Sequence, residues 1–370
     1  MAGIYLHIPF CKSKCAYCNF FSVVSEKQRA DFLDALKREA VARKDYLGGE
    51  EVRTIYFGGG TPTVLEAPEV LKVLEVLRNN YNINAAAEVT LEANPDTVSK
   101  ESLLEYKSLG INRLSIGIQS FFDDDLQYLS RKHDSKHALQ VLDWAKEIGF
   151  QEVTIDLIYG IPTLTDEKWR KNLEIFFSTG FNHLSAYALT IEEKTALGQR
   201  IKKGISSPVS EEATVRQYEI LVEMTKNHGF EHYEISNFAR PGHYSRHNTI
   251  YWKGEKYLGL GPSAHSFDGV SRQWNVASVK DYCENYSFER EELTLDDRYN
   301  EYVMTSLRTC WGCDMNFIRD NFGDEYVKRF KNLTKKYIIS GKMCQKDENF
   351  ILNDNGMLFA DGIASELFVG

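Results

Sequence analysis

Short apolar runs alternate with amphipathic segments along the first half of the chain. Between the runs, apolar residues recur at intervals of three and four, the spacing of a helix with one buried face; residues 70–77 are one example. Alternating strands and helices pair their strands in parallel through right-handed crossovers. The pattern therefore predicts an α/β fold for residues 1–190, with strands at 3–8, 53–57, 88–92, 113–119, 152–159 and 183–190.

The number of strands leaves two architectures open for this region. Six strand–helix units are fewer than the eight of a complete barrel, so an open doubly wound sheet and an incomplete (β/α)6 barrel both agree with the pattern. The rhythm changes after residue 190. Residues 191–285 are predicted to form a linker or extension, and 286–370 a smaller α+β, winged-helix-like domain. That domain should contain a hairpin at Asp354-Asn355-Gly356 and helices at 295–309, 314–322 and 325–340.

Composition and charge narrow the class of protein. The 370 residues are 43% apolar and 26% charged, as in ordinary globular proteins. Lys and Arg number 44 against 53 Asp and Glu, a net charge of −9, which disfavours nucleic-acid binding because such binders depend on positive charge. The N-terminal stretch lacks a basic segment, and no run of about 18 apolar residues occurs. We therefore expect a cytoplasmic protein without a signal peptide or transmembrane helix.

Three of the seven cysteines crowd into one loop directly after the first predicted strand: Cys11, Cys15 and Cys18. Such crowding is typical of a metal site in a reducing compartment rather than of a disulfide framework. Three thiolates can bind three irons of a cubane cluster and leave the fourth iron open to another ligand. A zinc site completed by His7 and unligated core cysteines are the alternatives.

A second motif, Gly58-Gly59-Gly60-Thr61-Pro62, follows the second predicted strand. Consecutive glycines let the backbone approach a ligand closely, although alone such a run is only a tight turn. Both motifs follow neighbouring strands, so we expect them at one edge of the sheet, where α/β proteins place their sites. Glu92 and Asp156 are polar residues in apolar strands and need partners, which could be a ligand or merely backbone N–H groups.

Together these motifs resemble the radical S-adenosylmethionine (SAM) superfamily, as does the run Tyr5-x-His7-x-Pro9-Phe10-Cys11. The similarity covers essentially the whole chain and is narrower for the HemN-like branch, which contains oxygen-independent coproporphyrinogen III oxidases and heme chaperones of the HemW type. The resemblance implies a [4Fe–4S] cluster on the three cysteines, with SAM on the open iron. The SAM contacts that it implies are Tyr5, Tyr17, Gly59, Gly60, Thr61, Glu92, Gln119, Arg131 and Asp156.

Two features favour the heme chaperones within this branch. The oxidases carry a fourth cysteine two residues beyond the third, where this chain has Phe20. The segment from His247 to Trp252 matches the HNxxYW signature of the chaperones. The resemblance thus implies a protein that binds heme and transfers it to an acceptor. The oxidase activity is the alternative, and a radical SAM enzyme with another substrate is a third interpretation.

His247 is the candidate heme ligand, because imidazole binds heme iron and its aromatic neighbours can cover a porphyrin. Packing in an interdomain seam is the alternative role for this side chain, and His265 is a second candidate. The expected partners are heme or a porphyrin and an unidentified heme-acceptor protein, with membrane contact only through that acceptor. Cys310 and Cys313 have zinc-like spacing without a complete ligand set, so we expect buried thiols there.

Overall fold

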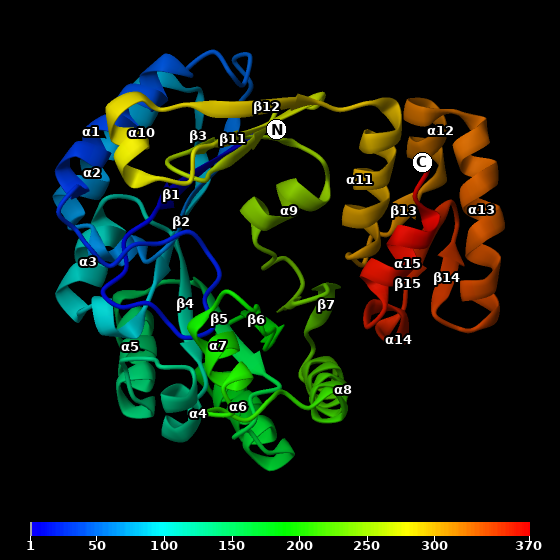
Figure 1. The fold of residues 1–370 in the computed structure, drawn as a ribbon, viewed down its shortest axis with the longest axis horizontal. Coiled ribbons are helices and arrows are strands. Elements are labelled where there is room, and N and C mark those ends of the chain that lie inside the picture. Colours follow the sequence, from blue (N-terminus) through cyan, green and yellow to red (C-terminus); the bar gives the residue numbers. More distant parts are fainter. Residues whose placement is uncertain (1) are drawn as a thin grey trace.

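A computed structural model describes residues 2–370 and contains one large open sheet of twelve strands. All six predicted strands are present and pair in parallel in chain order (Figure 1). They are β1 (Ala2–Ile8), β2 (Val52–Gly59), β3 (Ile83–Ala93), β4 (Arg113–Gln119), β5 (Glu152–Tyr159) and β6 (His183–Ala188).

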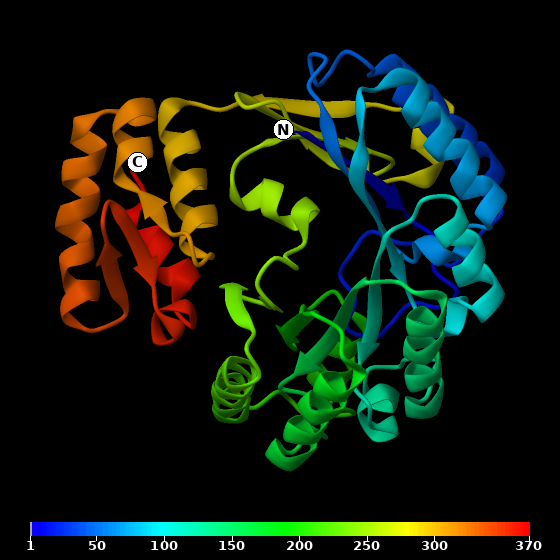
Figure 2. The same ribbon diagram turned by 180° about the vertical axis from the view of Figure 1, so that it is seen from behind.

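Helices between these strands cover one side of the sheet, as Figure 2 shows from behind. In α2 the buried face is made by Val70, Val73, Leu74 and Leu77, so the apolar spacing of that segment does mark its core side. Helix α4 begins with three aspartates, and the positive end of the helix dipole stabilises their negative charge. The helices are α1 (Arg29–Ala42), α2 (Ala67–Asn80), α3 (Lys100–Ser108), α4 (Asp123–Tyr128), α5 (Ser135–Ile148) and α6 (Asp166–Thr179), with short 3-10 turns η1 (Pro62–Val64) and η2 (Pro95–Thr97).

Residues after 190 add strands to both edges of this sheet. At one edge, β8 (Asn237–Ala239) pairs antiparallel with β6, and β7 (Glu231–Glu234) pairs with β8. At the other, β9 (Lys256–Leu260) pairs parallel with β1 and is followed outward by β10 (His265–Phe267), β11 (Ser271–Asn275) and β12 (Phe288–Glu292). Within the described chain, β7 and β12 stay unpaired with each other, so the barrel is incomplete, as predicted. The helices of this region are α7 (Ala196–Lys202), α8 (Glu211–Asn227), α9 (Arg246–Trp252) and α10 (Val279–Asn285).

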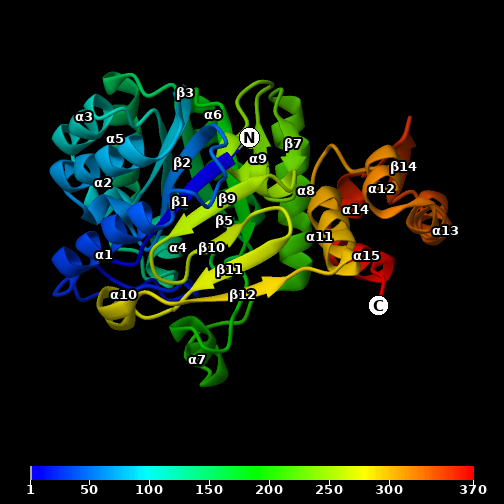
Figure 3. The ribbon, with the colours of Figure 1, turned by 90° about the horizontal axis from the view of Figure 1, so that it is seen from above.

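The C-terminal domain stands beside the barrel (Figure 3) and has its own apolar core. Its order of elements is helix, strand, two helices and a hairpin, which is the winged-helix-like arrangement that the sequence predicts. The elements are α11 (Leu295–Leu307), β13 (Cys313–Asp314), α12 (Met315–Phe322), α13 (Asp324–Ile339), β14 (Met343–Lys346), β15 (Asn349–Leu352), α14 (Asp354–Met357) and α15 (Ala360–Leu367).

The predicted position of the hairpin is wrong. The strands β14 and β15 turn at Asp347, whose φ is 54°, and not at the Asp-Asn-Gly run. That run opens α14, because the Asn353 side chain accepts a hydrogen bond from the Gly356 N–H and caps the helix. Asn and Asp serve both turns and helix caps, so their presence does not distinguish the two. Across the described residues no helix combines the length and apolar character needed to cross a bilayer.

Candidate functional site

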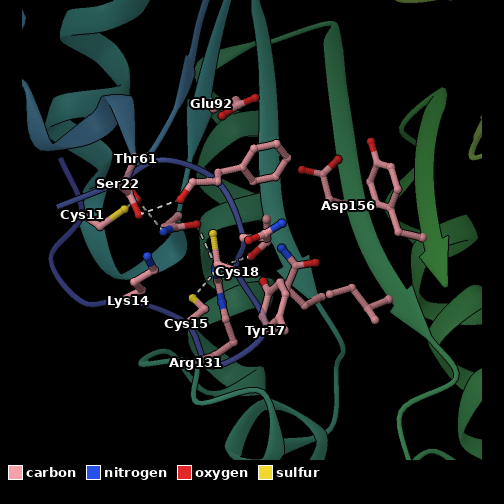
Figure 4. Close-up of a pocket in the computed structure, with 18 of the residues that line it drawn as sticks. Cys11, Lys14, Cys15, Tyr17, Cys18, Ser22, Thr61, Glu92, Arg131 and Asp156 are labelled. Atoms are coloured by element: carbon pink, nitrogen blue, oxygen red, sulfur yellow. Dashed lines mark hydrogen bonds between the residues drawn. The ribbon is translucent and has the colours of Figure 1, made fainter. Parts of the chain in front are cut away.

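A pocket of about 570 Å³ opens at the carboxyl ends of the parallel strands (Figure 4). The loop after β1 contributes all three clustered cysteines, and the end of β2 contributes Gly59, Gly60 and Thr61. The strands β3, β4 and β5 contribute Glu92, Gln119 and Asp156. The two sequence motifs therefore meet at one edge of the sheet, and the remaining predicted residues that line the same pocket are Tyr17 and Arg131.

The cysteine loop (residues 11–18) is held to the rest of the protein by backbone hydrogen bonds. The Cys11 N–H donates to the Val23 carbonyl at 3.0 Å, and the Ala16 carbonyl accepts from the Leu197 N–H at 2.8 Å. Two side chains also reach its sulfur atoms: the Thr61 hydroxyl donates to Cys11 Sγ at 3.5 Å, and the Arg131 guanidinium donates to Cys15 Sγ at 3.4 Å. The thiols are thus fixed at the pocket wall.

The donor set fits an iron–sulfur cluster better than a single zinc ion. Among residues 2–370, no three His, Cys, Asp or Glu side chains converge as ligands of one ion. A cubane cluster takes each thiolate on a different iron, so its ligands surround the cluster and do not converge. His7, the fourth ligand in the zinc alternative, is hydrogen-bonded through Nε2 to the Phe21 carbonyl at 2.9 Å and through Nδ1 to the Tyr5 hydroxyl at 3.2 Å. Both of its nitrogens are therefore engaged away from the thiols.

Burial raises the pKa of the Cys11 and Cys18 thiols, because the pocket wall excludes water from the thiolate form. A buried thiolate needs positive charge nearby, and an iron cluster supplies it. Three thiols on one loop at the wall of one pocket are a donor set that a cluster fits.

Two partly buried carboxyl groups face the pocket from β3 and β5. Glu92 accepts hydrogen bonds from the Tyr56 hydroxyl at 2.8 Å and from the Gly59 N–H at 3.2 Å, and Asp156 accepts from the Ser115 hydroxyl at 3.2 Å. Burial raises the pKa of Glu92 to about 7. Burial also raises the pKa of Asp156 to about 8, with a further contribution from the nearby charge of Glu92. Such a pair gains most from a cationic ligand. The alternative role, in which these carboxyl groups only accept bonds from backbone N–H groups, describes the bond from Gly59 to Glu92. It does not describe Asp156, whose partner is a side-chain hydroxyl.

Arg131 and Gln119 bring further polar groups to the pocket wall. The Arg131 guanidinium donates to the Gly117 carbonyl at 2.6 Å and to Asn94 Oδ1 at 2.9 Å, whereas its buried Nε has no partner in the described part of the chain. Gln119 has φ 70°, which is unusual for a residue other than glycine and is frequent at binding sites. A Cβ on Gly117 would lie 2.8 Å from the Gln119 amide nitrogen, so a side chain there would push the Gln119 amide aside.

The structure places Tyr5 and His247 outside the pocket. Tyr5 is half-buried on β1, where its ring stacks on that of Tyr56 with centroids 6.1 Å apart. His247 is 1% exposed on α9, with Nδ1 hydrogen-bonded to the Thr54 hydroxyl and Nε2 to the Tyr251 hydroxyl, each at 2.8 Å. Burial lowers the pKa of His247 to about 3, so the ring is neutral. This placement matches the packing alternative for His247. His265 lies on the short strand β10 beside the Trp274 ring.

Several pocket residues were not singled out from the sequence. Asn94 follows β3, Ser115 and Gly117 lie two residues apart on β4, and Tyr187 lies near the end of β6. Strand alternation could have identified Ser115 and Gly117, since side chains at this spacing from Gln119 share one face of the strand. Cys313 is buried in the C-terminal core, and Cys310 is partly buried.

Comparison with known proteins gives consistent matches. Residues 5–176 match the radical SAM superfamily, and 293–359 match the HemN C-terminal domain. The chain is 32% identical to the heme chaperone HemW of Bacillus subtilis (strain 168) over 371 residues, covering 98% of each protein. It is 36% identical over 265 residues to the mitochondrial radical S-adenosyl methionine domain-containing protein 1 of Danio rerio, which covers 71% of this chain and 60% of that protein. The solved structure of coproporphyrinogen III oxidase (HemN) from Escherichia coli matches with a TM-score of 0.86 at 26% identity, covering 100% of this chain and 90% of that one.

Proposed function

The chain belongs to the HemW family of radical SAM proteins, and from this premise we propose that it is a heme chaperone that binds heme and transfers it to an acceptor protein. The observation that carries the proposal is the similarity to the Bacillus subtilis heme chaperone along nearly the whole chain. That similarity includes the HNxxYW segment and the C-terminal domain, which lie beyond the part matched to the general superfamily. In this proposal heme is the cargo.

In the same proposal the pocket holds SAM on a [4Fe–4S] cluster. Cys11, Cys15 and Cys18 would bind the cluster, which when present supplies an electron to the bound sulfonium. The carboxyl groups of Glu92 and Asp156 offer negative charge to a ligand that carries positive charge. The Arg131 guanidinium, whose buried Nε has no partner among the described residues, offers a hydrogen-bond donor for a carboxylate. The proposed role of these residues is to bind SAM and orient it on the cluster.

The oxidase alternative is favoured by the overall agreement with the HemN structure, at a TM-score of 0.86. Phe20 argues against it. Its side chain lines the pocket, is 71% exposed, and stands where the oxidases are expected to carry a fourth cysteine. A phenyl ring offers no group that could exchange a proton or an electron with a porphyrinogen.

One experiment separates the two functions. The chain is reconstituted with iron and sulfide under anaerobic conditions and titrated with hemin, and the Soret band is followed. In parallel it is incubated with reductant, SAM and coproporphyrinogen III. We expect one hemin per chain, passage of that heme to an added apo-hemoprotein, and no protoporphyrinogen. Formation of protoporphyrinogen without hemin binding would contradict the chaperone and establish the oxidase.

A further inference from the structure

His247 lies at the base of a column of aromatic rings that leads to the pocket. Its ring stacks on the Tyr56 ring, with centroids 4.9 Å apart and planes at 25°. The Tyr56 hydroxyl donates to Glu92 Oε1 at 2.8 Å, and Glu92 Oε2 in turn accepts from the Gly59 N–H. Two contacts thus separate the first residue of the HNxxYW segment from a carboxyl group that lines the pocket.

A second branch of the column leads to the cysteine loop. The His247 and Tyr5 rings stack with centroids 6.3 Å apart. The Tyr5 hydroxyl is hydrogen-bonded to His7 Nδ1, and His7 Nε2 to the carbonyl of Phe21, three residues beyond Cys18. This branch gives a physical role to the Tyr-x-His pair before the cysteines.

Two glycines show how closely the column is packed. A Cβ on Gly3 would lie 2.3 Å from Ile250 Cδ1, so α9 rests directly on β1. A Cβ on Gly58 would lie between 2.8 and 3.0 Å from atoms of Tyr56, Tyr5 and Glu92. Because the rings pack closely against β1 and β2 at these two glycines, a shift of one ring presses on the next.

Helix α9 also closes a small polar chamber beneath the pocket. This chamber has a volume of about 60 Å³; Asn248 lines it from α9, while Glu92 and Asp156 form the wall that it shares with the pocket. The Thr90 hydroxyl is buried there without a partner among the described residues. The helix that carries the signature therefore borders the acidic pair on the side of the chamber, while the pocket borders it on the other.

We propose that His247 is a positioning residue for the SAM pocket. Through Tyr56 it fixes Glu92, and through Tyr5 and His7 it fixes the cysteine loop. The inference rests on the proposed role of the pocket as a SAM site, and it adds that the HNxxYW segment on α9 holds that site in position. Because coupling between sites is reciprocal, SAM binding in turn restrains α9.

A double-mutant cycle tests this coupling. The full chain is reconstituted anaerobically as wild type, His247→Ala, Tyr56→Phe and the double variant, and iron content is matched. The dissociation constant of SAM is then measured by equilibrium dialysis. We expect each single variant to weaken SAM binding by about 5-fold, and the double variant by much less than the product of the two, because both changes release the same carboxyl group.

The spectrum of the reduced cluster gives a readout that general destabilisation would not move. The change that SAM produces in its electron paramagnetic resonance signal should be smaller in His247→Ala than in the wild type. Lys253→Ala is the matched control: the side chain is exposed at the end of α9 and points to Trp311, and both measurements should stay at wild-type values.

Each result decides the matter. Wild-type SAM affinity in both single variants, or losses that multiply in the double variant, would overturn the inference and leave the proposed function standing. If His247→Ala does not fold, the conservative variant His247→Gln takes its place in the cycle. A wild type that binds hemin but no SAM would overturn the SAM part of the proposed function, and this inference with it.

Discussion

At the scale of single residues, burial sets the chemistry of several polar groups that line the pocket. Glu92 and Asp156 are the clearest case, since desolvation raises the pKa of each carboxyl. The three cysteines are the second case, because their environment disfavours a bare thiolate at Cys11 and Cys18. Ionising either set of groups costs free energy because burial disfavours the charged form. A nearby positive charge lowers that cost.

The stability of the cluster-free protein should depend on pH through Glu92. An acid whose pKa rises from 4.5 to about 7 on folding holds its proton more tightly in the folded state, so stability is lost as pH rises through that range. Glu92→Gln removes this loss. We expect its thermal midpoint to exceed that of the wild type at pH 8, by the equivalent of about 1–3 kcal/mol, and by less at pH 5. The control Glu219→Gln, on the exposed face of α8, should show no such pH dependence.

Removing one cysteine should abolish the cluster. A cubane that keeps only two of three protein ligands is lost during purification, so Cys15→Ala should contain almost no iron or sulfide after anaerobic reconstitution. Cys344→Ala, which changes a thiol on β14 of the C-terminal domain, is the control and should retain wild-type iron. Equal iron contents in the two variants would refute the assignment of the cysteine loop.

Heme ligation by His247 stays a prediction, and the hydrogen bonds of His247 suggest a specific test. Nε2 is bonded to the Tyr251 hydroxyl, so a heme iron would have to displace that bond. If His247 is the ligand, Tyr251→Phe should tighten hemin binding by about 2- to 10-fold, the range expected for one hydrogen bond. His247→Ala should weaken hemin binding while iron content is preserved. Hemin affinities unchanged in both variants would assign the heme to other residues.

At the scale of elements, the parallel strands form the pocket, and the short helix α9 packs inside the barrel next to it. The parallel strands β1 to β6 bring the two motifs together, and α9 packs against the start of β1 and β2 from the barrel interior. Only seven residues long, α9 is held by its neighbours more than by its own hydrogen bonds. Ser245 caps the start of α9, and the hydrogen bond from the His247 N–H to Glu88 anchors its first turn to β3.

The contact of α9 with β1 should be sensitive to a single methyl group. Gly3→Ala places a Cβ 2.3 Å from Ile250 Cδ1 and 2.6 Å from the Thr54 hydroxyl oxygen. We expect overpacking to destabilise the protein by about 1–3 kcal/mol in urea unfolding. Gly362→Ala on α15 is the contrasting control, because its Cβ would meet nothing within 4 Å and alanine favours a helix. A Gly3→Ala variant as stable as the wild type would show that α9 can move without cost.

At the scale of the whole molecule, the C-terminal domain spans the opening of the barrel. The chain enters the domain from β12, which is one edge of the large sheet, and the domain contacts β7, which is the other edge (Figure 1). The Cys310 N–H donates to the Tyr233 carbonyl at 3.0 Å, and Thr309 forms a β-bridge with Glu234. The open barrel is thus braced at both edges by the same domain.

Arg308 is the charged part of this brace. Its guanidinium lies 3.5 Å from Glu234, which is buried on β7, and 2.7 Å from Asp361 on α15. Arg308→Ala leaves the buried carboxylate without this partner, so amide hydrogen exchange in β7 should become about 10-fold faster or more. Arg319→Ala, which breaks an exposed pair with Asp324 in the same domain, should leave exchange in β7 unchanged.

Local pattern determined much of this protein. Six parallel strands, the amphipathic helices and the winged-helix-like order of the last domain were readable because each depends on the spacing of apolar residues within one segment. Motif spacing likewise brought the cysteine loop and the glycine run to one pocket, since carboxyl ends of adjacent parallel strands share an edge.

Tertiary structure decided the rest. The outer strands β7 to β12 are only three to five residues long, too short to show a clear periodicity. Their place at the two edges of the sheet depends on pairing with distant segments. The Asp354 run became a helix start because Asn353 found a donor in Gly356. Tyr5 and His247 lie 242 positions apart in the sequence, yet they stack in one column. No local pattern records such a contact, because it is created only when the barrel brings α9 against β1.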